Sequence, residues 1–348
     1  MRTHPALSAT AAATPNYLGL AALLRLSFGG ADLTSVCQGM LQRAVEDPRD
    51  AGSLMDAAVL LQFRGIADLV PRLQQEALKI RRHYVIAATR PARLRLLVLM
   101  APGNVMANVP IECLLEASDI ELNIYYATRD PEPAEIPDHD LLFIGIGESE
   151  ANRPILEAWL PLLTAWPRPV VNDARHVTRV ARDTAAALLH GLPGVAMPPT
   201  VRIARAELAA AAAQTGLLPE GIEYPLIVRP VDSHAGHDLY KIETPAELTE
   251  KLAVMAEDEF FISCFIDYSG ADGQFRKARV IMIDGRPYAC HMAVSSHWMI
   301  HYLNAGMAES AAKRAEEARF MAEFDSGFAS RHRAALSAIN EAIGLDYS

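Results

Sequence analysis

The sequence has few of the features that mark secreted, membrane-spanning or nucleic-acid-binding proteins. Its 348 residues include four cysteines, and aromatic residues make up 7%. The 32 Lys and Arg are outnumbered by 42 Asp and Glu, which gives a formal charge of −10. We therefore expect no broad basic surface for nucleic acid or an anionic membrane, although a local basic cleft for a phosphorylated ligand fits this charge. The length and the 51% hydrophobic content suit two or three globular domains.

Long apolar runs and targeting signals are also missing. The longest apolar run near the N-terminus, 17–24, is far shorter than the roughly 20 residues of a spanning helix. Residues 1–16 are rich in Ala, Thr and Ser, and we interpret them as a flexible leader and not a signal peptide. The cysteines form no C-x-x-C pair and lie in apolar stretches, which predicts four buried, free thiols in the reducing cytoplasm. They are Cys37, Cys113, Cys264 and Cys290.

Apolar residues recur at helical spacing from residue 17 to about 88 and predict an all-helical domain. Asp32 is the expected N-cap of the second helix, Ser53 that of the third, and Gly65 its stop. A fourth helix is expected to start after Pro71 and to include Tyr84.

The helical region also contains one possible repeat. Its segment 47–78 resembles a single tetratricopeptide-like helical hairpin, a unit that normally needs at least three copies to form an array. The plainer interpretation is a small helical domain packed on its neighbour. A protein partner bound by this domain is a further possibility.

From residue 94 the pattern changes to that of an α/β sheet. The continuous apolar run 94–100 is typical of a strand buried on both faces. The other predicted strands are 122–126, 141–146 and 170–171, and the helices between them are 111–117 and 155–163. This order predicts a small open α/β sheet covered on both sides, in a domain spanning 92–174.

The remaining residues, 175–348, combine strands with capped helices. Thr244 begins a capping box, and Asp284-Gly285 between two strand-like runs is a strong hairpin signal. The predicted strands are 225–230, 239–242, 260–266, 279–283 and 286–294. The predicted helices are 175–190, 206–214, one after Thr244, and a helical stretch over 305–343 broken near Gly327.

The order strand, loop, strand, capped helix, apolar strand, hairpin and helix resembles the ATP-grasp superfamily, in particular the ATP-binding domain of glutathione synthetase-like ligases. PLIVRPVDSHAG (225–236) is similar to the first strand and the loop over the phosphates. FFISCFID (260–267) is similar to the hinge strand. RKARVIMIDGRPYACHMAVSSHW (276–298) is similar to the hairpin with a phosphate-binding arginine.

The resemblance implies an α/β (α+β) fold with three parts: a helical N-terminal domain, a small Rossmann-like pre-ATP-grasp sheet, and an ATP-grasp core of antiparallel sheet and helices. It also implies an ATP-dependent carboxylate–amine or carboxylate–thiol ligase that works through an acyl phosphate. The cofactors would be ATP and Mg²⁺, and the substrates small molecules or peptides. No contact with nucleic acid or membrane is implied.

The resemblance assigns phosphate contacts to several residues. Arg229 follows a buried-looking strand, where its planar fork suits two phosphate oxygens; the alternative is a surface arginine on an edge strand. Ser233 and Gly236 lie in the covering loop. His234 and His237 replace expected glycines and are either phosphate donors or solvated loop residues. Arg279 would contact the γ-phosphate, and Lys277 lies on the same face of its strand.

The same resemblance also predicts which residues contact the nucleoside and the acceptor substrate. The segment from Ser263 to Phe265 would read the adenine, and Asp267 would take the ribose hydroxyls unless it is only a turn aspartate. The acceptor side would include His297, also a catalytic candidate, and the following residues: Trp298, His301 and Asn304. His297 and His301 have i, i+4 spacing, but only His291 is near enough to complete a zinc site, so a substrate pocket or a packed pair is favoured.

One departure from the family concerns the metal. GLDY (344–347) resembles the approach to two strands that carry magnesium-binding acids, and the sequence ends at Ser348. We therefore expect the Mg²⁺ ligands to be missing and ligase activity to be impaired. A shortened ligase is one interpretation; a degenerate nucleotide-binding or protein-interaction module is another. A third is a nucleotide-binding enzyme of a different class, with its site near Gly103 or Gly145.

Overall fold

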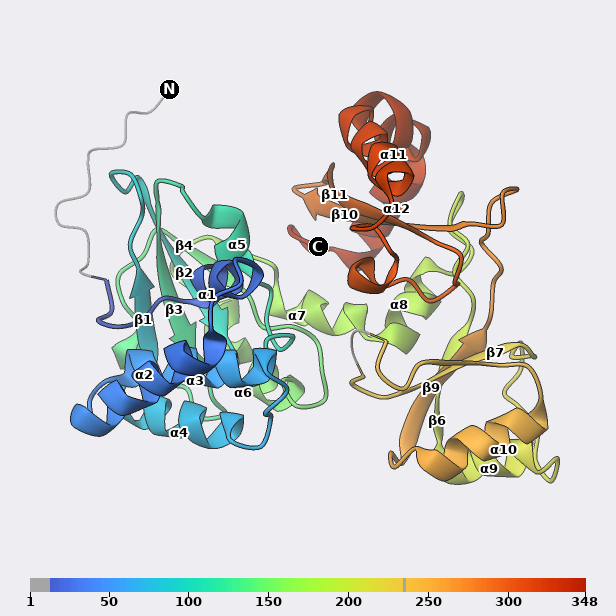
Figure 1. Cartoon of the computed structure of the whole chain (residues 1–348), viewed down its shortest axis with the longest axis horizontal. Helices are drawn as coiled ribbons and strands as arrows, with labels where there is room; N and C mark the ends of the chain where they lie inside the picture. Colours follow the sequence, from blue (N-terminus) through green and yellow to red (C-terminus); the bar gives the residue numbers. More distant parts are fainter. Residues whose placement is uncertain (1–12, 234–235) are drawn as a thin grey trace. The chain divides into compact units, whose positions relative to one another are not determined.

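The computed structural model describes residues 13–233 and 236–348, and the chain divides into two compact units, Met1–Val177 and Thr178–Ser348 (Figure 1). The predicted boundary near residues 88–92 lies inside the first unit, so the helical region and the α/β sheet form one body. None of the helices in the described ranges has both the length and the apolar character needed to cross a bilayer.

Four helices open the first unit, and α2, α3 and α4 lie together in Figure 1. Asp32 caps α2 as predicted, because its side chain accepts hydrogen bonds from the N–H groups of Thr34 and Ser35. The predicted cap of α3 is wrong: Asp50 is the N-cap and accepts from the N–H of Ser53. The bounds are α1 Leu20–Phe28, α2 Leu33–Glu46, α3 Ala51–Phe63 and α4 Val70–Ile80. Their shared core includes Leu23, Cys37, Met40, Ala57, Leu60 and Val70.

The prediction of helix up to residue 88 is wrong at its end. Residues His83–Ile86 form strand β1, which pairs antiparallel with β3 (Ile120–Tyr126). Tyr84 is fully buried in this strand. The leader prediction also fails where residues are described, since the Thr14 hydroxyl accepts from the Val85 N–H at 2.8 Å and Thr14 is buried. Residues 1–12 of that leader lie outside the described residues.

The sheet of the first unit confirms the predicted α/β class. Its strand order is β1-β3-β2-β4-β5, and β2 pairs in parallel with both β3 and β4. The predicted strand 94–100 is β2, Leu94–Met100. The remaining elements are β4 Leu141–Ile144, β5 Val170–Val171, α5 Ile111–Leu115, α6 Arg153–Thr164 and a 3-10 turn at Pro133–Glu135.

The predicted continuous helix 175–190 is interrupted. The structure has α7 (Ala174–Val177), a 3-10 turn at Thr178–Val180, and α8 (Arg182–Leu189). Ala181 precedes α8 in an extended conformation, with ψ of 141°, which ends the helical hydrogen-bonding pattern.

The second unit contains a four-stranded antiparallel sheet in the order β6-β9-β7-β8. Thr244 caps α10 as predicted, and its hydroxyl accepts from the Glu247 N–H at 3.3 Å. Strand β6 (Thr200–Ala204) was not predicted. The other bounds are β7 Leu226–Pro230, β8 Tyr240–Ile242, β9 Glu259–Cys264, α9 Arg205–Ala212 and α10 Pro245–Val254.

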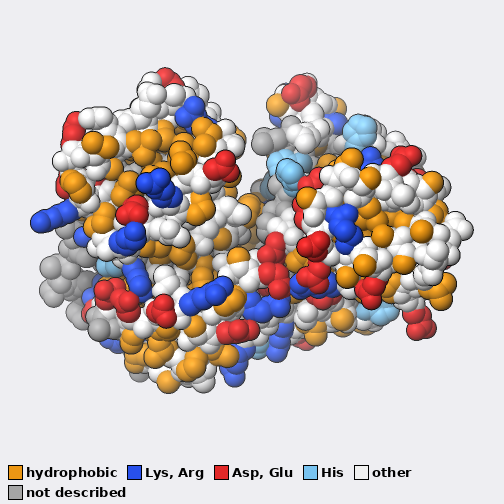
Figure 2. Space-filling model, turned by 90° about the horizontal axis from the view of Figure 1, so that it is seen from below, with side chains coloured by type: hydrophobic (Ala, Val, Ile, Leu, Met, Phe, Trp, Pro, Cys, Tyr) orange, Lys and Arg blue, Asp and Glu red, His pale blue; other side chains and the backbone are white. Residues whose placement is uncertain are grey.

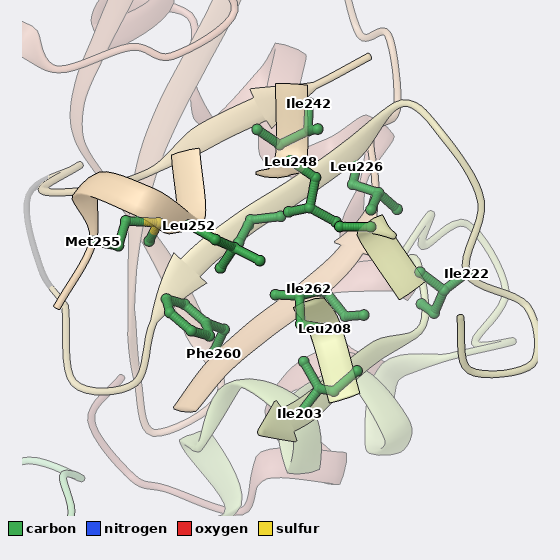
Figure 3. Close-up of a cluster of buried hydrophobic side chains, with 12 residues drawn as sticks. Ile203, Leu208, Ile222, Leu226, Ile242, Leu248, Leu252, Met255, Phe260 and Ile262 are labelled. Carbon is green, nitrogen blue, oxygen red and sulfur yellow. The ribbon is translucent and has the colours of Figure 1, made fainter. Parts of the chain in front are cut away.

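One face of this sheet is covered by α9 and α10, and Figure 3 shows their side chains converging on the strands. Leu208 of α9 and Leu248 of α10 are fully buried there. Leu226, Val228, Phe260 and Ile262 point into the same cluster from β7 and β9. This face is therefore the core of the sheet, and polar chemistry is left to the opposite face.

The predicted hairpin is confirmed. Its strands are β10 (Phe275–Ile283) and β11 (Arg286–Ser295), and the turn residues Asp284 and Gly285 both have positive φ. The last three residues lie beside β10, where the Met282 N–H donates to the Ser348 carbonyl at 2.8 Å. The closing helices are α11 Ala311–Ala322, a π-helix Asp325–Ala329 that contains the predicted break at Gly327, and α12 Arg333–Ile343.

The prediction of four buried cysteines is wrong for three of them. Cys37 is buried, whereas Cys113 and Cys290 are exposed and Cys264 is partly exposed. All four are free thiols. Cys290 alternates with inward residues of β11, so an apolar neighbourhood in sequence did not determine which face it occupies. On the face of the first unit drawn in Figure 2, acidic and basic side chains are intermingled.

Candidate functional site

The polar face of the second unit's sheet carries Arg229. In β7, Val228 pairs with Ile262 on the core face, so Arg229 and its partner Phe261 lie on the other face. Ile227 shares that face and pairs with Ser263 of β9 and Lys241 of β8. The strand pattern thus places a half-buried arginine beside an apolar and a hydroxyl side chain.

Arg229 is held by the loop that follows its own strand. Its Nε donates to the Ser233 hydroxyl at 3.1 Å, and its Nη2 donates to the Ser233 carbonyl. Arg182 of α8 donates to the same carbonyl at 3.2 Å. Burial and the nearby charge of Arg182 lower the pKa of Arg229 to about 10. Two guanidinium groups therefore converge on one neutral oxygen.

The loop after β7 approaches the segment after the hairpin. Gly236 has a φ of +80°, and a Cβ there would meet the Met299 sulfur at 3.0 Å, so a larger residue would be strained and crowded. The exposed His237 contacts the Asp238 carboxylate at 2.9 Å. The predicted His234 lies outside the described residues.

Lys277 and Arg279 of β10 belong to the same group of cations. Burial, and then the charges of Arg279 and Arg229, lower the pKa of Lys277. Lys277 is exposed as a whole, but its ammonium donates to the Ile300 carbonyl at 3.1 Å. Within residues 13–233 and 236–348, none of Arg229, Lys277 and Arg279 forms an ion pair. The structure thus brings these three predicted residues together without a carboxylate partner.

The segment expected to read a base lies at the end of β9. The Phe265 N–H donates to the Pro225 carbonyl at 2.8 Å, which fixes the chain next to the start of β7. The Lys241 ammonium lies 4.1 Å from the centre of the Phe265 ring, and Trp298 meets that ring edge-on at 5.8 Å. Ser263, Phe265 and Trp298 are all partly exposed.

Asp267 acts as a turn residue in the structure. Its carboxylate accepts from the Ser269 N–H at 2.9 Å. Hydrogen bonds from Ser269, backbone first, hold the pKa of Asp267 below its usual range. The side chain is exposed, so a sugar hydroxyl would share an oxygen that already has a local donor.

The predicted acceptor segment is exposed at both ends and half-buried at His301. His297 and Asn304 are exposed, whereas His301 is half-buried. Burial, and then the charge of Arg279, lower the pKa of His291, with His301 contributing further. His291 Nδ1 is buried with no partner among the described residues. His301 is thereby associated with the cations of β10, while His297 lies at the surface.

The described residues offer no metal site around these histidines. No three His, Cys, Asp or Glu side chains gather in a metal-binding arrangement within 13–233 and 236–348. The Glu317 carboxylate accepts from the Tyr302 hydroxyl at 2.7 Å and from the Met292 N–H at 3.1 Å. Glu317 is therefore held by two donors of the chain, and no step below is assigned to Mg²⁺.

Two residues of the site were missed from the sequence. Arg182 lies in a helix 47 positions before Arg229, and only the fold brings it to Ser233. Lys241 could have been found from strand alternation, because Tyr240 and Ile242 pack on the core and leave Lys241 on the opposite face.

At the alternative site predicted near Gly103 and Gly145, the two glycines lie where the chain packs closely on itself. A Cβ on Gly145 would lie 3.2 Å from the Leu99 carbonyl, and one on Gly103 would lie 3.0 Å from Ala107. Both glycines therefore allow close packing of the chain on itself. Gly103 also borders a cavity of about 720 Å³ in the first unit.

Comparison with known proteins finds similar solved structures only. No family model matches the chain, and no curated protein matches it. The chain is similar to the D-alanine–D-alanine ligase of Bacillus anthracis complexed with ATP, with 14% identity and a TM-score of 0.40 over 73% of this chain and 78% of that one.

Two further structures bear a comparable likeness. The D-alanine–D-alanine ligase of Coxiella burnetii has 12% identity and a TM-score of 0.42, over 73% of this chain and 78% of that one. A RimK domain ATP-grasp protein of Sphaerobacter thermophilus has 16% identity and a TM-score of 0.34, over 71% and 99%.

Proposed function

We propose that the second unit binds the phosphates of ATP, and that the protein is an ATP-dependent carboxylate–amine or carboxylate–thiol ligase of the ATP-grasp type. The observation that carries the proposal is the group formed by Arg229, Lys277 and Arg279. The charges of Arg229 and Arg279 both act on Lys277, and none of the three has a carboxylate partner in the described ranges. Like charges gathered on a protein face are costly unless an anion joins them, and a polyphosphate supplies several negative oxygens.

The proposed chemistry has two steps. A carboxylate oxygen of the substrate attacks the γ-phosphorus of ATP, the bond to the β,γ-bridging oxygen breaks, and ADP leaves with the electron pair. An amine or thiol then attacks the acyl carbon, phosphate departs, and the nucleophile loses a proton. Arg229 and Arg279 would hold the phosphate oxygens in line and stabilise the charge that develops on them. Lys277, two residues before Arg279 on β10, would stabilise the same negative charge on the phosphate oxygens.

The remaining residues suit the nucleoside and the acceptor. Ile227 shares the face of Arg229 and, with Phe265, offers an apolar seat for adenine. Backbone groups between Ser263 and Phe265 lie at the strand end, where a base edge can be read. Asp267 would make only a minor contact with the ribose, because its carboxylate already accepts a hydrogen bond from the Ser269 N–H. Trp298 and the exposed His297 would contact the acceptor substrate, and His301 and Asn304 would line its far side.

The test is calorimetric titration of the full chain with ATP, with and without Mg²⁺, together with an assay for ADP release in mixtures of carboxylates and amines. Arg229→Ala and Arg279→Ala should each weaken ATP binding. Arg286→Ala is the matched control, because Arg286 lies at the hairpin turn and stacks over Tyr288. Unchanged affinity in both active-site variants would refute the phosphate assignment.

A second candidate is a module that binds nucleotide without turning it over. It is favoured by one observation, that no three His, Cys, Asp or Glu side chains gather as metal ligands within residues 13–233 and 236–348. ATP binding that depends on Arg229, with no ADP release under any substrate mixture, would support this candidate over the ligase. In that case the helices of the first unit are the proposed contact for a protein partner.

A further inference from the structure

A cavity of the first unit lies where parallel strands end. It has a volume of about 720 Å³, and its walls come from α4, from the loop after β2 and from the residues after β3. The walls include Val70, Gln74, Leu78, Pro102, Asn104 and Thr128. The carboxyl ends of parallel strands are where open α/β sheets commonly bind ligands. A volume of this size falls within the roughly 300–1,000 Å³ of small-molecule sites.

Four amide side chains line the cavity, from Gln62, Gln74, Gln75 and Asn104, and the contacts of Gln74 and Asn104 leave each of these two with a free hydrogen-bonding group. Gln74 is only 6% exposed, and its Nε2 donates to the Gly103 carbonyl at 2.7 Å. That bond fixes the orientation of the amide and leaves its Oε1 with no donor in the described part of the chain. Asn104 accepts the Met106 N–H through Oδ1 at 2.8 Å, which leaves its Nδ2 hydrogens available. The cavity thus offers an acceptor from one wall and a donor from another.

The charged side chains at this cavity are already neutralised. The Lys79 ammonium pairs with Glu76 at 2.8 Å. Arg82 pairs with Glu132 at 3.0 Å and donates to the Asp130 carbonyl at 3.2 Å. The rest of the lining is mainly apolar, from Ala67, Val70, Leu78 and two prolines. A charged ligand would lose hydration here without gaining a free counter-charge.

We propose that this cavity binds an uncharged, largely apolar small molecule that carries a secondary amide, such as a capped apolar dipeptide. The ligand's amide N–H would donate to Gln74 Oε1, and its carbonyl would accept from Asn104 Nδ2. Its apolar groups would pack on Val70 and Leu78. The cavity is lined by residues of the first unit only, whereas the nucleotide site proposed above is built from residues of the second.

The test uses three probes on the full chain by isothermal titration calorimetry. The first is N-acetyl-leucyl-leucine N-methylamide, the second its methyl ester, and the third its free acid. The methylamide is expected to bind, the ester at least fivefold more weakly because it lacks one N–H donor, and the acid at least tenfold more weakly. No binding of the methylamide, or equal or tighter binding of the acid, would overturn the proposal.

Variants locate the binding. Ala67 is an exposed wall residue, so Ala67→Trp should fill the cavity and weaken methylamide binding at least tenfold. Ala151→Trp, an exposed position outside the lining, is the matched control and should change nothing. Gln74→Met should abolish the preference for amide over ester. Circular dichroism checks its fold, and if it unfolds, Ala67→Trp decides alone, because unchanged affinity there refutes the site.

Discussion

The two units differ in how they partner their charged side chains. In the first unit, the carboxylates of Asp56 and Glu112 are buried and receive hydrogen bonds from the chain itself. In the second, Arg229, Lys277 and Arg279 come together with no carboxylate partner in the described ranges. A charged side chain that is hydrogen-bonded by the chain itself has a structural role. A group of like charges without a counter-charge in the chain instead indicates a binding site for a ligand of opposite charge.

The two carboxylates of the first unit replace a missing cap on α1. The Asp56 carboxylate accepts from the N–H groups of Leu18 at 2.6 Å and Gly19 at 3.2 Å. Glu112 accepts from Leu20 at 2.6 Å and from Ala21. A Cβ at Gly19 would lie 2.6 Å from Glu112 Oε2, so only glycine fits there. Side chains from α3 and α5 therefore accept hydrogen bonds from the otherwise unpaired N–H groups at the start of α1, which is distant in sequence.

Titration of these carboxylates should produce the largest effect. Burial raises the pKa of Asp56 and of Glu112 to about 7, against the lowering effect of their N–H donors. The folded chain then holds more protons than the unfolded chain between pH 4 and 7, so the free energy of unfolding falls as pH rises through this window. The total change is on the order of several kcal/mol.

Urea unfolding at several pH values measures this slope. The double variant Asp56→Asn/Glu112→Gln removes both titrations and should flatten the curve between pH 4 and 7. A slope that is the same in the variant and in the wild type would show that other groups cause it.

Removing one carboxylate should cost stability at constant pH. Asp56→Ala leaves the N–H groups of Leu18 and Gly19 without an acceptor and opens a void, so the free energy of unfolding should drop by about 3 kcal/mol. Asp56→Asn keeps one acceptor oxygen and should lose roughly half as much. Equal stability of the alanine variant and the wild type in urea would contradict the capping role.

Removing one cation of the second unit should act on ligand binding and not on folding. Lys277→Met keeps the aliphatic stem and should weaken ATP binding about tenfold, or ~1.4 kcal/mol, with less dependence on salt. Its melting temperature should equal that of the wild type or exceed it, because a repulsion is relieved. Unchanged ATP affinity with a lower melting temperature would assign Lys277 to the fold.

The smallest effect is expected at Ser233. Ser233→Ala removes the hydroxyl that accepts from Arg229 Nε, but the Ser233 carbonyl keeps its contacts with Arg229 and Arg182. ATP affinity should change by less than about threefold, or roughly 0.6 kcal/mol. A tenfold loss in calorimetry would mean that the hydroxyl contacts the phosphate directly.

Local patterns predicted the elements whose signals are local. The apolar run of β2, the Thr244 cap and the Asp284-Gly285 turn are confirmed because each depends on neighbouring residues. Strands β1 and β6 were missed because each is short and is defined by a distant partner. β1 pairs with β3 some 40 positions later, and β6 pairs with β9. The four residues of β1 continue the apolar spacing of the preceding helix, α4, so hydrophobic periodicity did not show where the helix ends and the strand begins.

The same distinction holds for the candidate site. Arg229 was proposed because a charged residue ends an apolar strand, Arg279 because the hairpin resembles one that carries a phosphate-binding arginine, and Lys277 because it alternates onto the same face as Arg279. Arg182 and the capping role of Asp56 depend on segments brought together by folding, at separations of 51 and 37–38 positions from their partners. The sequence pattern alone did not indicate which charged side chains would find hydrogen-bonding partners within the chain.

The most direct test of the central claim compares ATP with AMP. Calorimetric titration of the full chain with each nucleotide separates the phosphates from the adenosine. If Arg229, Lys277 and Arg279 form a polyphosphate site, ATP should bind at least thirtyfold more tightly than AMP, about 2 kcal/mol or more. Equal affinities, or no binding of either nucleotide, would contradict the account.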